Sequence, residues 1–175
     1  MGFGIAIMGL NGAGKTTLGK CLEAMSEFKS LDVEAYYFPD PNDGYACSRS
    51  GEAVEKLLLE DMKKYPFFAV SSVRLSFGDE IKEKINLAVC LTAPKDERMM
   101  RIVRRAQEKF SSRVLPGGDM FEREEAFFRM AEKRDETMVL EAMEALSCPK
   151  LFLSGTDAPE ENAKRILDEI EKIKR

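Results

Sequence analysis

Short apolar runs alternate with amphipathic stretches along this chain. Four runs have the length and flanking turn residues of buried strands: Ile5–Met8, Tyr65–Val70, Leu87–Leu91 and Lys150–Leu153. A further run, Val33–Phe38, is rich in aromatic residues and predicts another strand. Between the runs, apolar residues recur every three or four positions, which predicts helices. The pattern therefore predicts strands and helices in alternation.

Five stretches have helical spacing. They follow Lys15, cover residues 52–64, 95–110 and about 120–146, and end the chain after a capping Thr156 or Asp157 with Pro159 in the first turn. Alternation of this kind predicts an α/β fold with a five-stranded parallel sheet covered by helices on both faces. No linker or repeat interrupts the 175 residues, so we expect one domain, 1–175.

Composition narrows the classes of function. A net charge of −4 gives no electrostatic case for nucleic acid as a partner. There is no apolar run near 18 residues and no basic segment before the first run, so we expect no membrane partner, no signal peptide and a cytoplasmic protein. Four scattered cysteines predict free thiols. Because the chain has no histidine, any general base must be Asp or Glu.

The turn after the first strand carries the clearest chemistry. Gly9–Thr16 reads GLNGAGKT and fits G-x-x-x-x-G-K-[ST], the phosphate-binding P-loop or Walker A motif. Its glycines allow unusual φ angles and a close approach of backbone N–H groups to an anion, and the following helix directs its positive end to the same place. Lys15 would reach the β- and γ-phosphates of ATP, and the Thr16 hydroxyl would ligate Mg²⁺.

The alternative is a glycine-rich turn in which the lysine stands by accident. Average residue usage gives such a match at a rate of roughly one chain in a hundred of this length. The strand before the motif and the helix after it favour nucleotide binding. The residues expected to bind the nucleotide here are Gly9, Asn11, Gly12, Ala13, Gly14, Lys15, Thr16 and Thr17.

Acidic residues for metal or acceptor are less clearly marked. Asp40 follows the predicted strand Val33–Phe38 and is equally well explained as a turn residue or a site residue. P-loop enzymes often place a metal-holding Asp after the third strand, where this chain has Ser71 and Ser72. Either the metal is held without that Asp, or Asp79 supplies the charge. In the same loop, Arg74 is either an anchor for an anionic acceptor or a solvated cation.

In combination these motifs resemble the small P-loop kinases, which include adenylate, shikimate and gluconate kinases. The resemblance rests on Gly9–Thr16, on the arginine-bearing helix that leads into Arg113–Gly118, and on Leu153–Asp157. It implies a three-layer α/β/α P-loop NTPase fold, ATP with Mg²⁺, and a mobile lid at about 111–120. An ATP-dependent phosphotransferase, acting as a monomer or homodimer on a small-molecule acceptor, is the function implied.

The resemblance also implies roles by position. Arg113 is similar to the lid arginine that contacts the transferring phosphate. Arg101 and Arg105 look like nucleotide-side arginines, and the loop with Gly155 and Thr156 looks like one that reads the adenine edge. Asp40 is similar in place to an acidic residue that orients the acceptor hydroxyl.

The acceptor stays open. Neither the Asp-Gly-Phe-Pro-Arg stretch of adenylate kinases nor the Gly-Gly-Gly stretch of shikimate kinases is present. A nucleoside or nucleotide would suit an aromatic pocket, whereas a polyol or acid would suit Asp40 with few aromatics. No Asn-Lys-x-Asp guanine signature is present, but an ATP-binding regulatory module or weak ATPase is an alternative. The aromatic candidates are Tyr36, Tyr37, Phe38, Tyr45 and Phe77.

Overall fold

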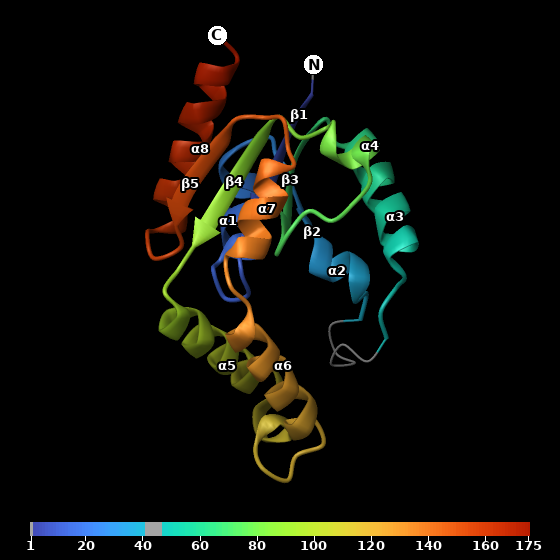
Figure 1. Ribbon diagram of the computed structural model, residues 1–175, viewed down its shortest axis with the longest axis vertical. Helices are drawn as coiled ribbons and strands as arrows, with labels where there is room; N and C mark the ends of the chain where they lie inside the picture. Colours follow the sequence, from blue (N-terminus) through green and yellow to red (C-terminus); the bar gives the residue numbers. More distant parts are fainter. Residues whose placement is uncertain (1, 41–46) are drawn as a thin grey trace.

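A computed structural model describes residues 2–40 and 47–175 of this chain. Its centre is a five-stranded, all-parallel sheet in the order β2-β3-β1-β4-β5 (Figure 1). The strands are β1 (Phe3–Met8), β2 (Lys29–Asp32), β3 (Phe67–Ser72), β4 (Leu87–Thr92) and β5 (Lys150–Ser154). β1 lies between β3 and β4, so the loop that follows it opens at the middle of the sheet's carboxyl edge.

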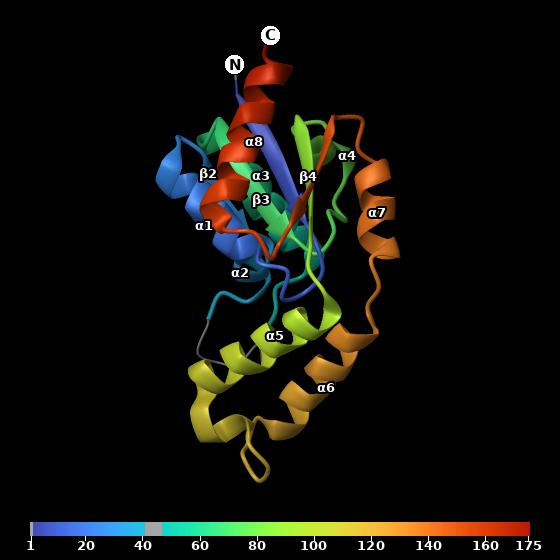
Figure 2. The same ribbon diagram turned by 90° about the vertical axis from the view of Figure 1, so that its left-hand side faces the viewer.

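Helices cover both faces of the sheet, because alternate residues of each inner strand point to opposite sides. One face carries α1 (Lys15–Met25) and α8 (Pro159–Ile173), whose Leu18, Leu22 and Ile166 pack on strand residues such as Ile5 and Val89. The other face carries α2 (Val33–Tyr37), α3 (Gly51–Lys64), α4 (Asp79–Lys82) and α7 (Thr137–Glu144). Figure 2 shows α4 and α7 on the side of the sheet opposite to α1 and α8. The predicted three-layer α/β/α fold is confirmed.

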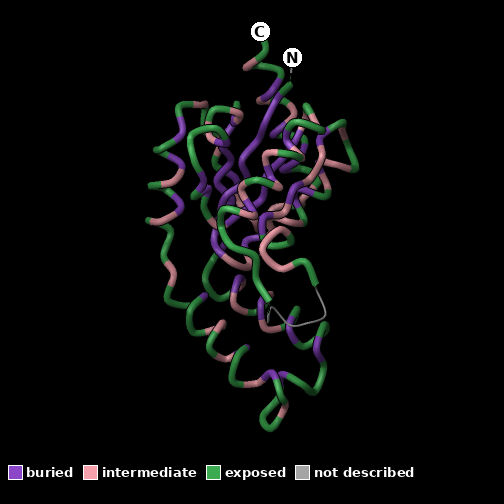
Figure 3. Tube along the Cα trace, turned by 90° about the vertical axis from the view of Figure 1, so that its right-hand side faces the viewer, coloured by how far each residue is buried: buried purple, intermediate pink, exposed green. Residues whose placement is uncertain are grey.

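The third part of the fold is an arm that projects beyond the carboxyl edge of the sheet. It consists of α5 (Lys95–Phe110), the short 3₁₀ helix η1 (Ser111–Val114) and α6 (Phe121–Lys133) (Figure 1). Phe110, Val114 and Met120 form a small core of their own at its tip. Figure 3 shows that buried residues concentrate around the sheet, whereas the arm is mostly exposed. None of the described helices is both long and apolar enough to cross a membrane.

The prediction of a strand at Val33–Phe38 is wrong. The second strand is the short segment Lys29–Asp32, and the next five residues form α2. Asp32 starts this helix, because its Oδ1 accepts a hydrogen bond from the Glu34 backbone N–H at 3.0 Å. The aromatic residues that suggested a strand are used in helix packing instead, since β-propensity mostly reflects packing on a half-buried surface.

The prediction of one helix over about 120–146 is also wrong. α6 ends at Lys133, and Arg134 has an extended backbone with ψ 135°. The Asp135 side chain then accepts a hydrogen bond from Thr137 N at 2.9 Å, at the start of α7. Apolar spacing continues through the break, so the pattern alone does not show it. Because of the break, Arg134 belongs to neither α6 nor α7.

The placement of α2 can be tested at Tyr36, whose hydroxyl donates a hydrogen bond to Asp61 Oδ2 of α3 at 2.5 Å. We predict that Tyr36→Phe lowers the free energy of unfolding by about 1–2 kcal/mol, because it leaves a half-buried carboxylate without this donor. Chemical denaturation measures the change. The matched control is Tyr37→Phe on the same helix, with an expected change within about 0.5 kcal/mol. Equal effects in both variants would contradict this packing.

Candidate functional site

The loop after β1 has the backbone of an anion cradle. Gly12 and Gly14 have φ of 82° and 101°, in the left-handed region that side chains rarely adopt. Gly9 is needed for a different reason: a Cβ there would collide with the Leu91 carbonyl oxygen of β4. α1 begins at Lys15, directly after Gly14, so the N–H groups of its first turn face the loop. This geometry is what the motif predicts.

Lys15 lies half-buried in this loop. Its Nζ donates a hydrogen bond to the Leu10 carbonyl oxygen at 3.0 Å. Burial lowers the pKa of Lys15 to about 8, an effect that nearby Asp32 and Glu34 oppose and that Arg105 and Arg134 increase. The ammonium group is therefore held where its charge is costly, and an anionic ligand beside it would favour the protonated form.

Thr16 is paired with an acid that the sequence reading missed. Its hydroxyl donates to Oδ2 of Asp32, the last residue of β2, at 2.7 Å. A hydroxyl beside a carboxylate provides the hard oxygen ligands that Mg²⁺ prefers when substrate phosphates and water supply the rest. Among the described residues there is no cluster of three acidic or thiol ligands, so a metal here would depend on phosphate oxygens as well. The two residues present fit Mg²⁺.

The carboxyl end of β3 holds serines where P-loop enzymes often have an Asp. Ser71 is fully buried, and its hydroxyl donates to the Lys15 carbonyl oxygen at 3.3 Å, which supports the first turn of α1. Asp79 does not supply the missing charge. It starts α4 and borders a hollow of about 930 Å³ together with Phe3, at the opposite end of the sheet from the P-loop.

That hollow lies at the amino-terminal edge of the strands, between α4, α7 and α8, and Asn86 and Cys148 also line it. Parallel α/β sheets bind their ligands beyond the carboxyl ends of the strands, where the connections diverge. The P-loop, Asp32 and the nearby arginines all lie at the carboxyl end. The candidate active site is therefore placed there.

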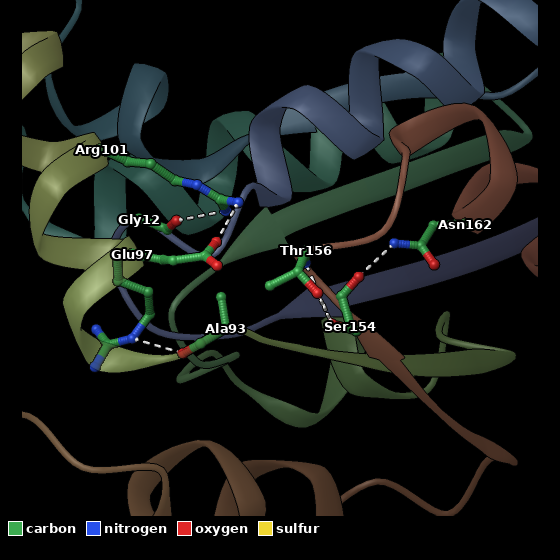
Figure 4. A network of polar contacts seen from close by, with 8 residues as sticks. Gly12, Ala93, Glu97, Arg101, Ser154, Thr156 and Asn162 are labelled. Carbon is green, nitrogen blue, oxygen red and sulfur yellow. Dashed lines mark hydrogen bonds and ion pairs between the residues drawn. The ribbon is translucent and has the colours of Figure 1, made fainter.

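Two arginines of α5 donate hydrogen bonds to main-chain carbonyl oxygens of the P-loop. Arg98 is 4% exposed, and its guanidinium donates to the carbonyl oxygens of Ala93 at 3.3 Å and Asn11 at 3.2 Å. Arg101 donates to the Gly12 carbonyl oxygen at 3.3 Å and to Glu97 at 3.1 Å (Figure 4). In a trans peptide the C=O and the following N–H point in opposite directions. Holding the Asn11 carbonyl therefore turns the Gly12 N–H away from Arg98.

Arg134 reaches the same loop from the break between α6 and α7. Its Nη1 donates to Asn11 Oδ1 at 2.7 Å. Burial, and after it the charge of Arg74, lowers the pKa of Arg134 below its ordinary value. Arg74 follows β3 in a loop whose Val73 carbonyl accepts a hydrogen bond from Gly9 N at 3.3 Å. Arg134 therefore contacts the P-loop directly, and Arg74 lies within electrostatic reach of Arg134.

The loop after β5, which contains Gly155 and Thr156, lies against the P-loop, and the role of these two residues in contacting the adenine stays a prediction. Gly155 N donates to the Thr92 carbonyl oxygen at 2.6 Å, and a Cβ at Gly155 would collide with the Ala13 carbonyl oxygen. Thr156 is exposed, and its hydroxyl is 2.7 Å from Ser154 Oγ (Figure 4). Asn162 of α8 holds the base of the loop by donating to the Ser154 carbonyl at 2.7 Å.

Two predicted catalytic residues are not brought to Lys15 in this structure. Arg113 lies at the tip of the arm, exposed, and pairs with Asp119 through three hydrogen bonds of 2.7–3.2 Å. Asp40 is exposed and follows α2, so the premise that it comes directly after a strand is wrong. Asp32 holds that position instead. Arg105 is exposed on α5 within electrostatic reach of Lys15.

The aromatic pocket considered for a nucleoside is only partly consistent with the structure. Phe77 is buried in the core, and Tyr36 and Tyr37 pack against the same core. Tyr45 lies outside the described residues. Phe77, Tyr36 and Tyr37 therefore mostly stabilise the fold.

Sequence reasoning missed Asp32, Arg98 and Arg134 at this site. Asp32 ends a four-residue strand, Lys-Ser-Leu-Asp, with too few apolar positions to recognise. Its signal was the acidic residue directly before a helical segment. Arg98 and Arg134 look like ordinary surface charges in the helix pattern, and only tertiary structure brings them to Asn11.

No protein-family model matches the chain. It is 29% identical over 172 residues to the uncharacterized protein YqaC of Bacillus subtilis (strain 168), which covers 94% of this chain and 95% of that protein. Among solved structures it is similar to the shikimate kinase of Acinetobacter baumannii in complex with shikimate, with a TM-score of 0.61, 19% identity, and coverage of 97% of this chain and 93% of that one.

Two further solved structures are similar. A putative kinase from Chloroflexus aurantiacus has a TM-score of 0.62 and 16% identity over 98% of this chain and 97% of that one. A gluconokinase from Sinorhizobium meliloti has a TM-score of 0.55 and 12% identity over 98% and 93%. The chain therefore has the fold of the small P-loop kinases, as its motifs predict.

Proposed function

We propose that this chain is an ATP-dependent phosphotransferase that moves the γ-phosphoryl group of ATP to a small-molecule acceptor. The observation that carries this proposal is the convergence of Lys15, Thr16 and Asp32 at the start of α1, with Arg105, Arg134 and Arg74 around them. Phosphoryl transfer depends mainly on positioning and on charge stabilisation, which such a set of groups provides. The solved kinases of the same fold support the same reaction class.

The residues divide into roles by their positions. The P-loop N–H groups and Lys15 would hold the β- and γ-phosphates, and the loop with Gly155 and Thr156 would face the base. Thr16 and Asp32 would hold Mg²⁺, which neutralises charge on the phosphates when it is bound. Glu34 is exposed on the first turn of α2 and lies within electrostatic reach of Lys15, and we assign it to the orientation of an acceptor hydroxyl.

The arm would act as the lid of the proposed enzyme. Residues 111–120 form its tip, and we assign them the lid role implied by the sequence. Arg113 would contact the transferring phosphate only after the arm moves toward the P-loop, because here it pairs with Asp119. Closure of such a lid excludes water, which would otherwise compete with the acceptor.

Two arginines near the P-loop, Arg74 and Arg134, favour an anionic acceptor. Arg74 and Arg134 approach each other closely enough for the charge of Arg74 to lower the pKa of Arg134. An anionic group on the acceptor would relieve that repulsion. The acceptor that fits is therefore a hydroxylated small molecule with a carboxylate or phosphate group.

The direct test is ATP consumption by the purified protein with Mg²⁺ across nucleoside monophosphates, nucleosides, hydroxy acids, sugar acids and polyols. We predict strong stimulation by one anionic hydroxylated compound and none by its neutral analogue, because Arg74 and Arg134 need a negative partner. Lys15→Ala is the inactive control. A flat panel with retained ATP binding would support the alternative of an ATP-binding regulatory module or weak ATPase.

Asp32 is proposed to act through the metal, whereas Asp40 is implied to orient the acceptor hydroxyl, and their amide variants test these two roles. We predict that Asp32→Asn lowers kcat by roughly 100-fold, because it removes charge beside the proposed metal ligand Thr16. Raising the Mg²⁺ concentration should restore part of the rate in Asp32→Asn if the carboxylate acts through the metal. Asp40→Asn is the matched comparison, and steady-state kinetics measures both. An unchanged kcat in Asp32→Asn, or a loss that added Mg²⁺ does not relieve, would contradict the metal role of Asp32, whereas a loss in Asp40→Asn would support the acceptor role that the resemblance implies for Asp40.

The pKa of Lys15 gives a pH prediction. Without ligand it is about 8, so at that pH about half of the Lys15 side chains carry a proton. Bound phosphates raise this pKa, so binding takes up about half a proton at pH 8, and the affinity falls as the pH rises through 8. Calorimetry in buffers of different ionisation enthalpy measures the uptake. Lys15→Arg, which keeps its charge at this pH, should show none. Equal uptake by both proteins would contradict the assignment.

A further inference from the structure

The arm is fastened to the rest of the protein at both of its ends. α5 and α6 pack mainly on each other and on η1, and Lys95 pairs with Glu132 at 3.5 Å where the two helices meet at the base of the arm. The tip holds itself together through its own small core and through the Arg113–Asp119 pair. The arm therefore has the internal contacts of a unit that moves as one body about its base.

Both ends of that base contact one residue of the P-loop. At the beginning of the arm, Arg98 of α5 donates to the main-chain oxygen of Asn11 at 3.2 Å. At its end, Arg134 donates to the side-chain oxygen of Asn11 at 2.7 Å. Arg98 is buried, so its contact is protected from water, and its guanidinium donates to main-chain oxygens of the arm's base and of the loop. A change in the Asn11 peptide or side chain reaches both ends of the arm.

We propose that Asn11 is a coupling residue through which nucleotide at the P-loop sets the position of the α5–α6 arm, with Arg98 and Arg134 as the two positioning contacts. The proposal rests on nucleotide binding at the P-loop, as proposed above. A phosphate group beside Lys15 attracts the Arg134 guanidinium, which has four further N–H donors besides the one used on Asn11. Arg134 keeps its hydrogen bond to Asn11 while its other donors reach the phosphate, so nucleotide draws the base of the arm toward the P-loop.

Coupling of this kind must be reciprocal. If nucleotide binding moves the arm through the Asn11–Arg134 contact, then the position of the arm changes the affinity for nucleotide by the same coupling free energy, and breaking the contact removes that contribution to binding. Asn11→Ala removes the side-chain acceptor and keeps the carbonyl that Arg98 holds. Arg134→Met removes the donor and keeps a long apolar side chain. These two variants break the same hydrogen bond from opposite sides.

The test is a double-mutant cycle on the affinity for Mg·ATP, measured by calorimetry, with thermal unfolding to check that each variant is folded. We expect each single variant to weaken binding by about 10-fold and the double variant to be no weaker than the weaker single. Arg134→Lys, which keeps the charge and loses the planar fork, should lie between wild type and Arg134→Met. Arg129→Met is the matched control, since Arg129 is exposed on α6 and pairs with Glu125. We expect it to bind ATP as wild type does.

A second readout reports the arm directly. The chain has no tryptophan, so Leu115→Trp, at an exposed position of the tip, gives a single reporter. Its emission should change when Mg·ATP saturates the otherwise unchanged protein, and the change should fall by at least half in Asn11→Ala and Arg134→Met. Arg129→Met should keep the full change.

The outcomes separate this proposal from the proposed function. Independent effects that multiply to about 100-fold in the double variant would overturn the coupling while leaving nucleotide binding intact. A full emission change in both single variants would overturn it as well. A wild-type protein that binds no ATP would overturn the proposed function, and the coupling with it.

Discussion

Positive charge that is withdrawn from water around the P-loop is the constraint on which the site depends. Lys15 and Arg98 both give hydrogen bonds to main-chain carbonyls, and burial lowers the pKa of Lys15 to about 8. Holding cations in this way opposes folding unless another interaction compensates. The rigid sheet, whose β1 and β4 residues are almost completely buried, supplies that compensation through hydrophobic packing. A polyphosphate would find its counter-charges already positioned, which is the condition for efficient electrostatic catalysis.

The sheet and the arm have separate tasks in this account. The sheet fixes the P-loop, Asp32 and the loop after β5 at one edge, where Gly155 touches the P-loop backbone. The arm carries Arg113 at its tip and Arg98, Arg101 and Arg134 at its base. Because the arginines at the base contact Asn11 and Gly12, the arm that we propose as a lid is connected to the loop that would bind phosphate. In our proposal, that connection would couple nucleotide binding to the position of the lid.

Much of the fold could be predicted from local sequence, and the reasons for the failures are physical. α5 has the predicted bounds, 95–110, because a capping proline and a strongly amphipathic pattern define it. The P-loop could be recognised because each of its residue types has a local backbone role. β2 was misplaced because its four residues carry little apolar signal, while Tyr36 and Tyr37 beside it use their aromatic rings on a helix. Asp32, Arg98 and Arg134 belong to the site through contacts that span up to 123 positions of sequence, which no local pattern contains.

The central claim is that Lys15 and its loop bind a nucleoside triphosphate, and equilibrium binding tests it most directly. The measurement is calorimetric titration of ATP and of AMP, each with Mg²⁺, into the wild-type protein and into Lys15→Ala, with both proteins shown to be folded. The account predicts that one ATP binds per wild-type chain and that Lys15→Ala binds ATP far more weakly. It also predicts that Lys15→Ala binds ATP no more tightly than AMP. Binding of ATP to Lys15→Ala with wild-type affinity would contradict the claim.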